Sequence, residues 1–300
     1  MKKDWNKEQE RIQQALSAAR SSKPAYAELY PFLEALFAIQ LAVKKELELG
    51  PVDMSIGLVE TKWSEGFPLL KRWEFPIDVA AAERVLLHME EHVPAGNEAL
   101  KRAHNALRQA LNKQAENGKA VWESFMHYEW EPWEEWVDTA GVDLASLFFW
   151  ARAGLRPSIE WTTEDLLSRF ALPAGWVKGY CPVCGSLPAL LFLSGEGERH
   201  GYCSWCGSEW GLYRMQCPVC DNRLHESLGY LYTEAEPLYH VHYCHLCKTY
   251  FKQIDLREKL ADAYFPLEEW TTLHLDLLAQ QAGWKQPESP SPIVYDKGPT

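Results

Sequence analysis

Eight cysteines arranged as four C-x-x-C pairs constrain this 300-residue sequence more than any other feature. The pairs are Cys181 with Cys184, Cys203 with Cys206, Cys217 with Cys220, and Cys244 with Cys247. They use every cysteine in the chain. A C-x-x-C pair places two thiolates on one tight turn, and two such turns facing each other complete a tetrahedral four-sulfur site. The spacing therefore predicts two metal sites, with these eight cysteines as the ligands.

The segments between the pairs indicate which pairs combine. Residues 187–193 and 198–202 have the pattern of two strands joined by a turn at 194–197, and residues 228–232 and 239–243 repeat this plan. A hairpin in each gap brings sequential pairs together. We therefore expect Cys181, Cys184, Cys203 and Cys206 to form one site, and Cys217, Cys220, Cys244 and Cys247 to form the other. A cross-braced arrangement that joins the first pair to the third is the alternative.

The residues around the cysteines argue against a redox-active C-x-x-C motif but do not distinguish zinc from iron. Four thiolates in a tetrahedron suit both zinc and iron. A redox-active C-x-x-C normally stands beside a βαβ pattern, which these hairpins lack. Glycines follow the second cysteine at Gly185 and Gly207, where a turn requires a positive φ. Five histidines in this region are expected to be polar hairpin residues, because the cysteines already fill both sites: His200, His225, His240, His242 and His245.

The first 175 residues contain no cysteine and have a helical pattern. Apolar periodicity predicts helices from residue 5 and over residues 31–50, 77–92, 95–117, 118–130, 143–153 and 163–170. Thr162 or Thr163 is expected to cap the last of these. The predicted fold is α+β and multidomain: an irregular helical bundle (1–175), two rubredoxin-like or zinc-ribbon β modules (176–213 and 214–255), a C-terminal helical segment (256–285) and a disordered tail (286–300).

One helical stretch, residues 122–136, carries four tryptophans and five glutamates with no lysine or arginine. The main interpretation is an aromatic stripe that faces the core, with the glutamates in solvent. The alternative is a surface on which a partner protein docks, because exposed tryptophans are good interface anchors.

Charge and composition exclude several functions. The net charge is −12, and residues 181–247 contain three basic and seven acidic side chains, which disfavours nucleic-acid binding. The N-terminus does not have the pattern of a secretory signal, and the apolar runs are too short to cross a bilayer, so we expect a cytoplasmic protein without membrane insertion. No nucleophile elbow or phosphate-binding glycine loop is present, and a closed four-sulfur site leaves no open position for substrate, so an enzyme is not expected.

Residues 178–284 resemble a known family, the formate dehydrogenase accessory proteins called FdhE. The resemblance rests on Cys181-Pro182-Val183-Cys184-Gly185-Ser186, on Tyr202-Cys203-Ser204-Trp205-Cys206-Gly207-Ser208-Glu209-Trp210, and on Cys217-Pro218-Val219-Cys220. It continues through Tyr243-Cys244-His245-Leu246-Cys247-Lys248-Thr249-Tyr250 and Thr271-Thr272-Leu273-His274-Leu275-Asp276.

The resemblance implies a helical domain followed by two rubredoxin-like modules, in a cytoplasmic accessory protein that binds the catalytic subunit of a respiratory formate dehydrogenase and supports its maturation. It implies two mononuclear metal ions on the eight cysteines and favours iron, with zinc as the alternative. The second module departs from the rubredoxin pattern at Asp221 and Lys248, which weakens the expectation of iron redox chemistry there. The competing functions are an iron electron-transfer or redox-sensing protein and, less favoured, a zinc-ribbon nucleic-acid binder. A homodimer is left open.

Overall fold

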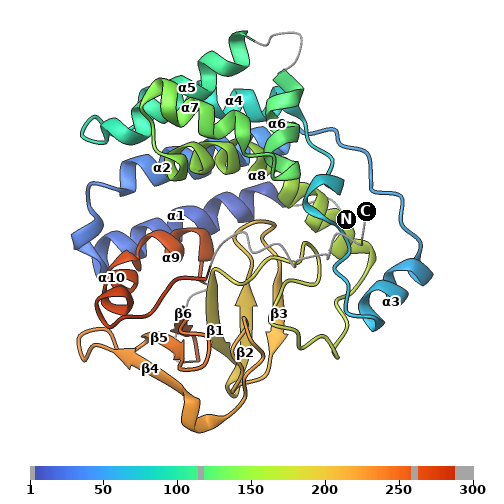
Figure 1. Cartoon of the computed structure of the whole chain (residues 1–300), viewed down its shortest axis with the longest axis vertical. Helices are drawn as coiled ribbons and strands as arrows, with labels where there is room; N and C mark the ends of the chain where they lie inside the picture. The colour runs from blue at the N-terminus through green and yellow to red at the C-terminus, as the bar shows by residue number, and fades with distance from the viewer. Residues whose placement is uncertain (1–3, 114–117, 258–262, 288–300) are drawn as a thin grey trace. The chain divides into compact units, whose positions relative to one another are not determined.

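The structure, a computed structural model, describes residues 4–113, 118–257 and 263–287 (Figure 1). The chain divides into two compact units, each described here by itself. The helical unit comprises Met1–Val52 and Lys71–Leu166, and the cysteine-rich unit comprises Asp53–Leu70 and Leu167–Thr300. The short segment Asp53–Leu70 thus packs with the cysteines, although helical sequence flanks it on both sides. Most of the tail expected to be disordered, residues 288–300, lies outside the described residues.

The helices and strands have these bounds. The helices are α1 (Trp5–Ser22), α2 (Tyr30–Lys45), α3 (Ile56–Ser64), α4 (Val79–Met89), α5 (Glu98–Lys113), α6 (Gly118–His127), α7 (Glu131–Ala140), α8 (Leu144–Arg169), α9 (Phe265–Trp270) and α10 (Leu273–Gln281). The strands are β1 (Leu190–Ser194), β2 (Glu198–Tyr202), β3 (Glu209–Leu212), β4 (Leu228–Tyr232), β5 (Tyr239–Cys244) and β6 (Tyr250–Asp255).

The helices α1, α2, α4, α5 and α6 correspond to predicted helices, although their ends differ by several residues. The prediction of two separate helices at 143–153 and 163–170 is wrong, because α8 runs without interruption from Leu144 to Arg169. Thr163 lies inside α8 and does not cap a helix, since its hydroxyl donates to the carbonyl of Ile159 at 2.9 Å. The short helices α3 and α7 were not predicted.

The continuity of α8 depends on a side chain from α2. Pro157 lies inside α8 and has no N–H to donate to the carbonyl of Ala153, one turn earlier. The side-chain amide of Gln40 donates to that carbonyl instead, at 2.9 Å. A Cβ added at Gly154 would lie 3.0 Å from Trp122 and 3.1 Å from the carbonyl oxygen of Ala82, so a larger residue would push these neighbours apart. These tertiary contacts stabilise α8 at the point where Pro157 removes one of its backbone hydrogen bonds.

Two tryptophans of the stretch at residues 122–136 belong to the core of the helical unit, and Trp130 and Trp136 are half-buried. Trp122 and Trp133 are fully buried, and the indole N–H of Trp133 donates to the hydroxyl of Ser124 at 3.0 Å. The glutamates of the stretch are exposed. The interpretation as a core-facing aromatic stripe with a solvated acidic face is therefore confirmed.

The strands form one six-stranded mixed sheet in the cysteine-rich unit, in the order β3-β2-β1-β6-β5-β4 (Figure 1). Both predicted hairpins, β1 with β2 and β4 with β5, are present as antiparallel pairs. The strands β3 and β6 were not predicted. Strand β6 pairs parallel to β1, with Leu190 opposite Lys252 and Leu193 opposite Asp255. The predicted fold class is confirmed, with the addition that both modules share one sheet.

The helices α9 and α10 pack on one face of this sheet. Phe265 of α9 packs with Leu190 and Phe192, and Leu275 of α10 packs with Val241 and Tyr250. Buried polar contacts fix the position of α10. The carboxylate of Asp276 accepts hydrogen bonds from the Tyr250 hydroxyl at 2.9 Å and from the Lys252 ammonium group at 2.8 Å. Because side chains alternate along a strand, Arg199, His242 and Tyr230 belong to the opposite face.

Among the described residues, every helix is either too short or too polar to cross a membrane.

Candidate metal centres

The four C-x-x-C pairs share one backbone design, which we call the knuckle. In each knuckle the N–H of the residue after the second cysteine donates to the carbonyl of the first cysteine, at 2.8–3.0 Å. The N–H of the first cysteine donates to the carbonyl one residue further along, also at 2.8–3.0 Å. Two backbone hydrogen bonds therefore close the loop from both sides and hold both cysteine side chains on the same side of the turn.

The residue after the second cysteine adopts a left-handed conformation in every knuckle. Its φ is 77° at Gly185 and Gly207, as the sequence predicted for the two glycines. It is 56° at Asp221 and 62° at Lys248, although these residues carry side chains that disfavour this region. The second module therefore reproduces the backbone of the first despite its different residues.

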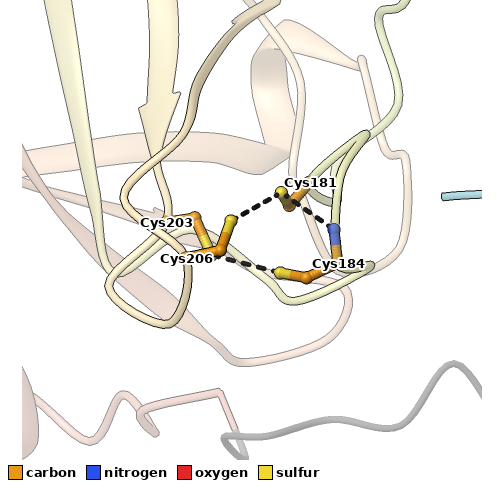
Figure 2. A group of neighbouring side chains, drawn as sticks. All are labelled: Cys181, Cys184, Cys203 and Cys206. Atoms are coloured by element: carbon orange, nitrogen blue, oxygen red, sulfur yellow. Dashed lines mark hydrogen bonds between the residues drawn. The ribbon is translucent and has the colours of Figure 1, made fainter. Parts of the chain in front are cut away.

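The knuckles meet in sequential pairs. Cys181, Cys184, Cys203 and Cys206 form one group, the first centre, and their side chains turn toward one another in Figure 2. Cys217, Cys220, Cys244 and Cys247 form the other group, the second centre. Within each group the ligand atoms lie within 4.8 Å of one another. This is the pairing expected from the hairpins, and it differs from the cross-braced alternative.

The sulfur separations fit a tetrahedral ion. In the first centre the sulfur of Cys181 lies 3.5 Å from that of Cys206, and the sulfur of Cys184 lies 3.4 Å from that of Cys203. In the second centre the Cys217–Cys247 and Cys220–Cys244 sulfur distances are 3.5 and 3.7 Å. A disulfide needs about 2.05 Å. A tetrahedron with metal–sulfur bonds of about 2.3 Å has edges of about 3.8 Å. Each group could therefore hold one metal ion, and the four-thiolate donor set suits zinc and iron alike.

Side chains at one repeated position form hydrogen bonds with the sulfurs. The residue two places after the second cysteine is Ser186, Ser208, Asn222 or Thr249. Ser208 lies 2.9 Å from the sulfur of Cys181 and 3.2 Å from that of Cys206, and Thr249 lies 2.9 Å from the sulfur of Cys247. Ser186 contacts Cys184 at 3.3 Å, and Asn222 contacts Cys244 at 3.5 Å. The sequence analysis did not identify these residues, although a hydroxyl or amide at the same offset in all four pairs was a visible signal.

Backbone N–H groups also point at sulfur in the first centre. Those of Val183 and Cys184 lie 3.3 and 3.4 Å from the sulfur of Cys181. Hydrogen bonds of this kind stabilise a thiolate and tune the ion that it binds.

The cysteines in each group ionise unequally. Burial opposes ionisation of Cys181, but hydrogen bonds from the other thiols and from Ser208 outweigh it and hold the pKa of Cys181 well below its usual value. Burial raises the pKa of Cys184 and Cys206. In the second centre burial also opposes ionisation of Cys244, yet donors led by the Cys247 backbone N–H lower its pKa to about 7. Each group thus contains one cysteine that ionises more readily than the others. Binding a metal cation would release protons from the remaining thiols of the group.

The two centres differ in exposure. Cys181, Cys203 and Cys206 are buried, whereas Cys220 of the second centre is exposed. Large apolar side chains also reach solvent around the second centre, namely Tyr213, Met215, Val219, Leu224 and Leu246. Val219 and Leu246 lie between the cysteines of their own knuckles. Leu246 is 63% exposed, among the most exposed of the large apolar side chains described.

A distant segment braces the first centre. The backbone N–H groups of Leu69 and Leu70 donate to the carbonyls of Pro182 and Val183 at 3.0 and 2.9 Å. The indole N–H of Trp63 donates to the Pro182 carbonyl at 3.1 Å. We call residues 53–70, which contain α3, the strap. The sequence analysis assigned them to the helical domain and did not anticipate this contact.

The histidines of this region stay outside both cysteine groups. His200 stacks on Phe192 with ring centroids 5.0 Å apart, as expected for a polar hairpin residue. His240 and His242 lie near Tyr230, with centroids 5.7 and 5.9 Å from its ring.

Comparison with known proteins gives a consistent result. No family model matches the chain. The protein "Protein FdhE homolog" of Aquifex aeolicus is 38% identical over 113 residues, which cover 36% of this chain and 40% of that protein. The homolog of Edwardsiella ictaluri is 31% identical over 161 residues, 52% of this chain and 49% of that protein. The chain thus matches less than half the length of either relative. A longer match, to the homolog of Pectobacterium atrosepticum, is 24% identical and covers 84% of this chain and 72% of that protein.

The fold is also similar to a solved structure. The crystal structure of the FdhE protein from Pseudomonas aeruginosa matches with a TM-score of 0.59 and covers 94% of this chain and 92% of that one. At 20% identity this match shows the fold. The resemblance to the FdhE family that the sequence predicted is therefore confirmed.

Proposed function

We propose that this relative of the FdhE proteins is a cytoplasmic accessory protein that binds the catalytic subunit of a respiratory formate dehydrogenase and supports its maturation. The observation that carries the proposal is the pair of four-cysteine groups, set in a fold shared with an FdhE protein. In this proposal the eight cysteines are the ligands of two metal ions, and the chain binds its client without catalysing a reaction. A closed four-thiolate site supports that binding role, because it leaves no position open to a substrate.

The ions would act by holding the knuckles together. Hairpins of this size bury little apolar surface of their own, so ligand binding contributes directly to their folding free energy. The resemblance favours iron, and zinc fits the same donors. In either case the chain's contribution is to place four sulfurs and to supply hydrogen bonds to them from Ser186, Ser208, Asn222 and Thr249.

The second centre offers the better docking face for the client. Its knuckles carry exposed apolar side chains, whereas the knuckle at Cys181 is covered by the strap through Pro182 and Val183. Contiguous exposed apolar side chains with a polar surround are typical of protein interaction sites. The same part of the chain has an excess of acidic over basic residues, which favours a protein over a nucleic acid as the partner.

The docking face can be tested with a single substitution. Leu246→Glu should weaken binding of the purified catalytic subunit at least about tenfold in an interferometry assay, because it places a charge at the centre of an apolar contact. Leu87→Glu is the matched control, since Leu87 is an exposed leucine (49%) on α4 of the helical unit. Metal content and circular dichroism should match the wild type in both variants. Undiminished affinity of Leu246→Glu would refute this docking face.

Electron transfer is the second candidate, and the donors to sulfur are the observation that favours it. Reduction potentials of iron–thiolate centres depend on such hydrogen bonds. The visible spectrum of protein purified without oxygen from iron-replete cells distinguishes a redox-active iron centre from a zinc site. A coloured protein that can be reduced and reoxidised would support this function, and a colourless, zinc-loaded protein would exclude it.

A further inference from the structure

The cysteine-rich unit contains a cavity of about 450 Å³ beside the second centre. Its wall includes Arg199, Arg214, His225, Tyr230, His242 and Phe251, together with the ligand cysteines Cys217 and Cys244. Among the described residues, the wall contains two arginines and two histidines but no aspartate or glutamate. This is unexpected in a chain with 42 acidic residues and a net charge of −12. The lining therefore favours a negatively charged occupant.

Arg199 is the buried cation of this wall. Its side chain leaves β2 on the sheet face opposite α9 and α10, and the residue is only 4% exposed. Its Nε donates to Gln253 at 2.9 Å, and its Nη1 donates to the carbonyls of Gln216 and Arg214 at 2.7 and 3.3 Å. These bonds leave the two N–H donors of Nη2, and the described residues supply no further partner for them.

Two other buried cations, Lys44 and Lys252, have carboxylate partners. Lys44 lies 2.8 Å from Glu160 and 2.7 Å from Glu164, and Lys252 lies 2.8 Å from Asp276. Burying a charge without a partner is strongly unfavourable. Burial lowers the pKa of Arg199 to about 10, so the guanidinium is still charged at neutral pH.

The second centre offsets only part of this positive charge. Cys217 and Cys244 line the same cavity, and the negative charge of Cys217 acts to raise the pKa of Arg199. Sulfur, however, is a weak and diffuse hydrogen-bond acceptor compared with a carboxylate, which accepts two parallel bonds from one guanidinium. The cavity is also much larger than one buried side chain requires, and Leu228, Tyr230 and Phe251 give it apolar walls. Its volume lies within the range of small-ligand sites.

We propose that this cavity is a binding site for the carboxylate of a ligand with an aromatic or aliphatic body. The carboxylate accepts hydrogen bonds from the guanidinium of Arg199, and the body of the ligand packs against Tyr230 and Phe251. The carboxylate can belong to a free small molecule or to the C-terminus of a peptide, since both present the same group. The inference does not depend on the accessory role or on the identity of the metal.

The test uses the full chain loaded with zinc and labelled with ¹⁵N-arginine. Benzoate, added at constant ionic strength, should shift the Nε–H resonance of Arg199 to saturation, and the neutral isostere benzamide should bind at least about tenfold more weakly. A dipeptide ending in a free phenylalanine carboxylate, compared with its amide, is the second arm. Stronger binding of the dipeptide acid than of benzoate would identify a peptide terminus as the source, and the reverse would identify a small molecule.

Variants separate this site from a purely electrostatic role. Because these variants lack the Arg199 resonance, their binding is measured by isothermal titration calorimetry: Arg199→Gln should abolish benzoate binding and Arg199→Lys should retain part of it, with zinc content unchanged in both. Arg223→Gln, at an exposed arginine paired with Asp221, is the control and should bind benzoate as the wild type does. Equal binding of benzoate and benzamide to the wild type, or no saturable shift at all, would overturn the proposal. Loss of zinc in Arg199→Gln together with no benzoate binding to the wild type would show that Arg199 only balances the thiolate charge.

Discussion

At the scale of single residues, the four knuckles share one backbone conformation although their sequences differ. All four need a left-handed residue after the second cysteine, yet only two have glycine there. Asp221 compensates in part, because its carboxylate accepts a hydrogen bond from the side-chain amide of Gln216 at 2.6 Å. For other residues this conformation costs about 1–2 kcal/mol. The departure of the second module from the rubredoxin pattern therefore changes the residues and leaves the knuckle geometry intact.

Thr249 provides a residue-scale prediction about metal retention. Thr249→Val preserves the shape of the side chain but removes the hydroxyl that lies 2.9 Å from the sulfur of Cys247. Losing such an outer contact typically weakens metal affinity about tenfold or more. We expect this loss at the second centre, measured by competition with a chromophoric chelator.

Thr249→Ser is the matched control for that experiment, because it keeps the hydroxyl and loses only a methyl group. It should hold metal as the wild type does. If Thr249→Val and Thr249→Ser released metal alike, the hydroxyl would have no role in retaining the ion.

At the scale of secondary structure elements, α8 shows why part of the fold could not be predicted. Sequence periodicity identified α1, α2, α4, α5, α6 and both hairpins, and it missed α3 and α7. It divided α8 in two, because no local pattern indicates that Gln40, more than a hundred residues away, satisfies the carbonyl left open by Pro157. It also missed β6, because Lys252, Gln253 and Asp255 are buried in that strand and make its pattern look polar.

Gln40→Leu should destabilise the helical unit. The substitution keeps an approximate side-chain volume but leaves the carbonyl of Ala153 without its donor, which costs about 1–3 kcal/mol when the group is buried. The free energy of unfolding, measured in urea by circular dichroism, should fall by that amount. Gln13→Leu, at an exposed position on α1, should change it by less than about 0.5 kcal/mol. Equal losses in the two variants would contradict this account of α8.

The ion pairs between α2 and α8 predict how stability depends on pH. Burial opposes the charge on Glu160, but Arg156 and Lys44 outweigh it and lower the pKa of Glu160 to about 2. A carboxylate whose folded-state pKa lies below its unfolded value of about 4.3 stabilises the fold above that pH. That contribution disappears as the pH falls from about 4.5 toward 2. It amounts to about 2–3 kcal/mol when fully present.

Comparison of the wild type with Glu160→Gln isolates this effect from other titrating groups. The wild type should be more stable in urea at pH 7, and the difference between the two proteins should shrink as the pH approaches 2. A difference that stays constant from pH 7 to pH 3 would show that the ionised carboxylate contributes little.

At the scale of the whole molecule, the parallel pairing of β1 with β6 joins the two modules into one sheet. The hairpins and the cysteine pairing could be predicted from local sequence. The shared sheet could not, because β1 and β6 are about sixty residues apart and the pairing leaves no mark on the sequence between them. The first centre includes the β2–β3 connection and the second includes the β5–β6 connection of this one sheet. We therefore expect the centres to depend on each other.

Substitution of one centre should reveal that dependence. In Cys181→Ser/Cys184→Ser the first centre loses two of its four sulfurs, β1 loses its anchor, and β6 loses its parallel partner. Zinc content after reconstitution and dialysis should fall from about two to well below one ion per chain, measured by mass spectrometry. Amide hydrogen exchange in β5 and β6 should become faster in parallel. One retained ion and unchanged protection of β5 and β6 would show that the modules fold independently.

The contacts of the strap also limit when this part of the chain can fold during synthesis. Leu69 and Leu70 hydrogen-bond to residues 182 and 183, so a ribosome must add more than a hundred residues after the strap before its partner exists. At about 5–20 residues per second this takes roughly 6–23 s. During that interval the nascent helical unit carries the strap as an unfinished insertion. The strap therefore stays without these hydrogen-bond partners for at least this long in every newly made chain.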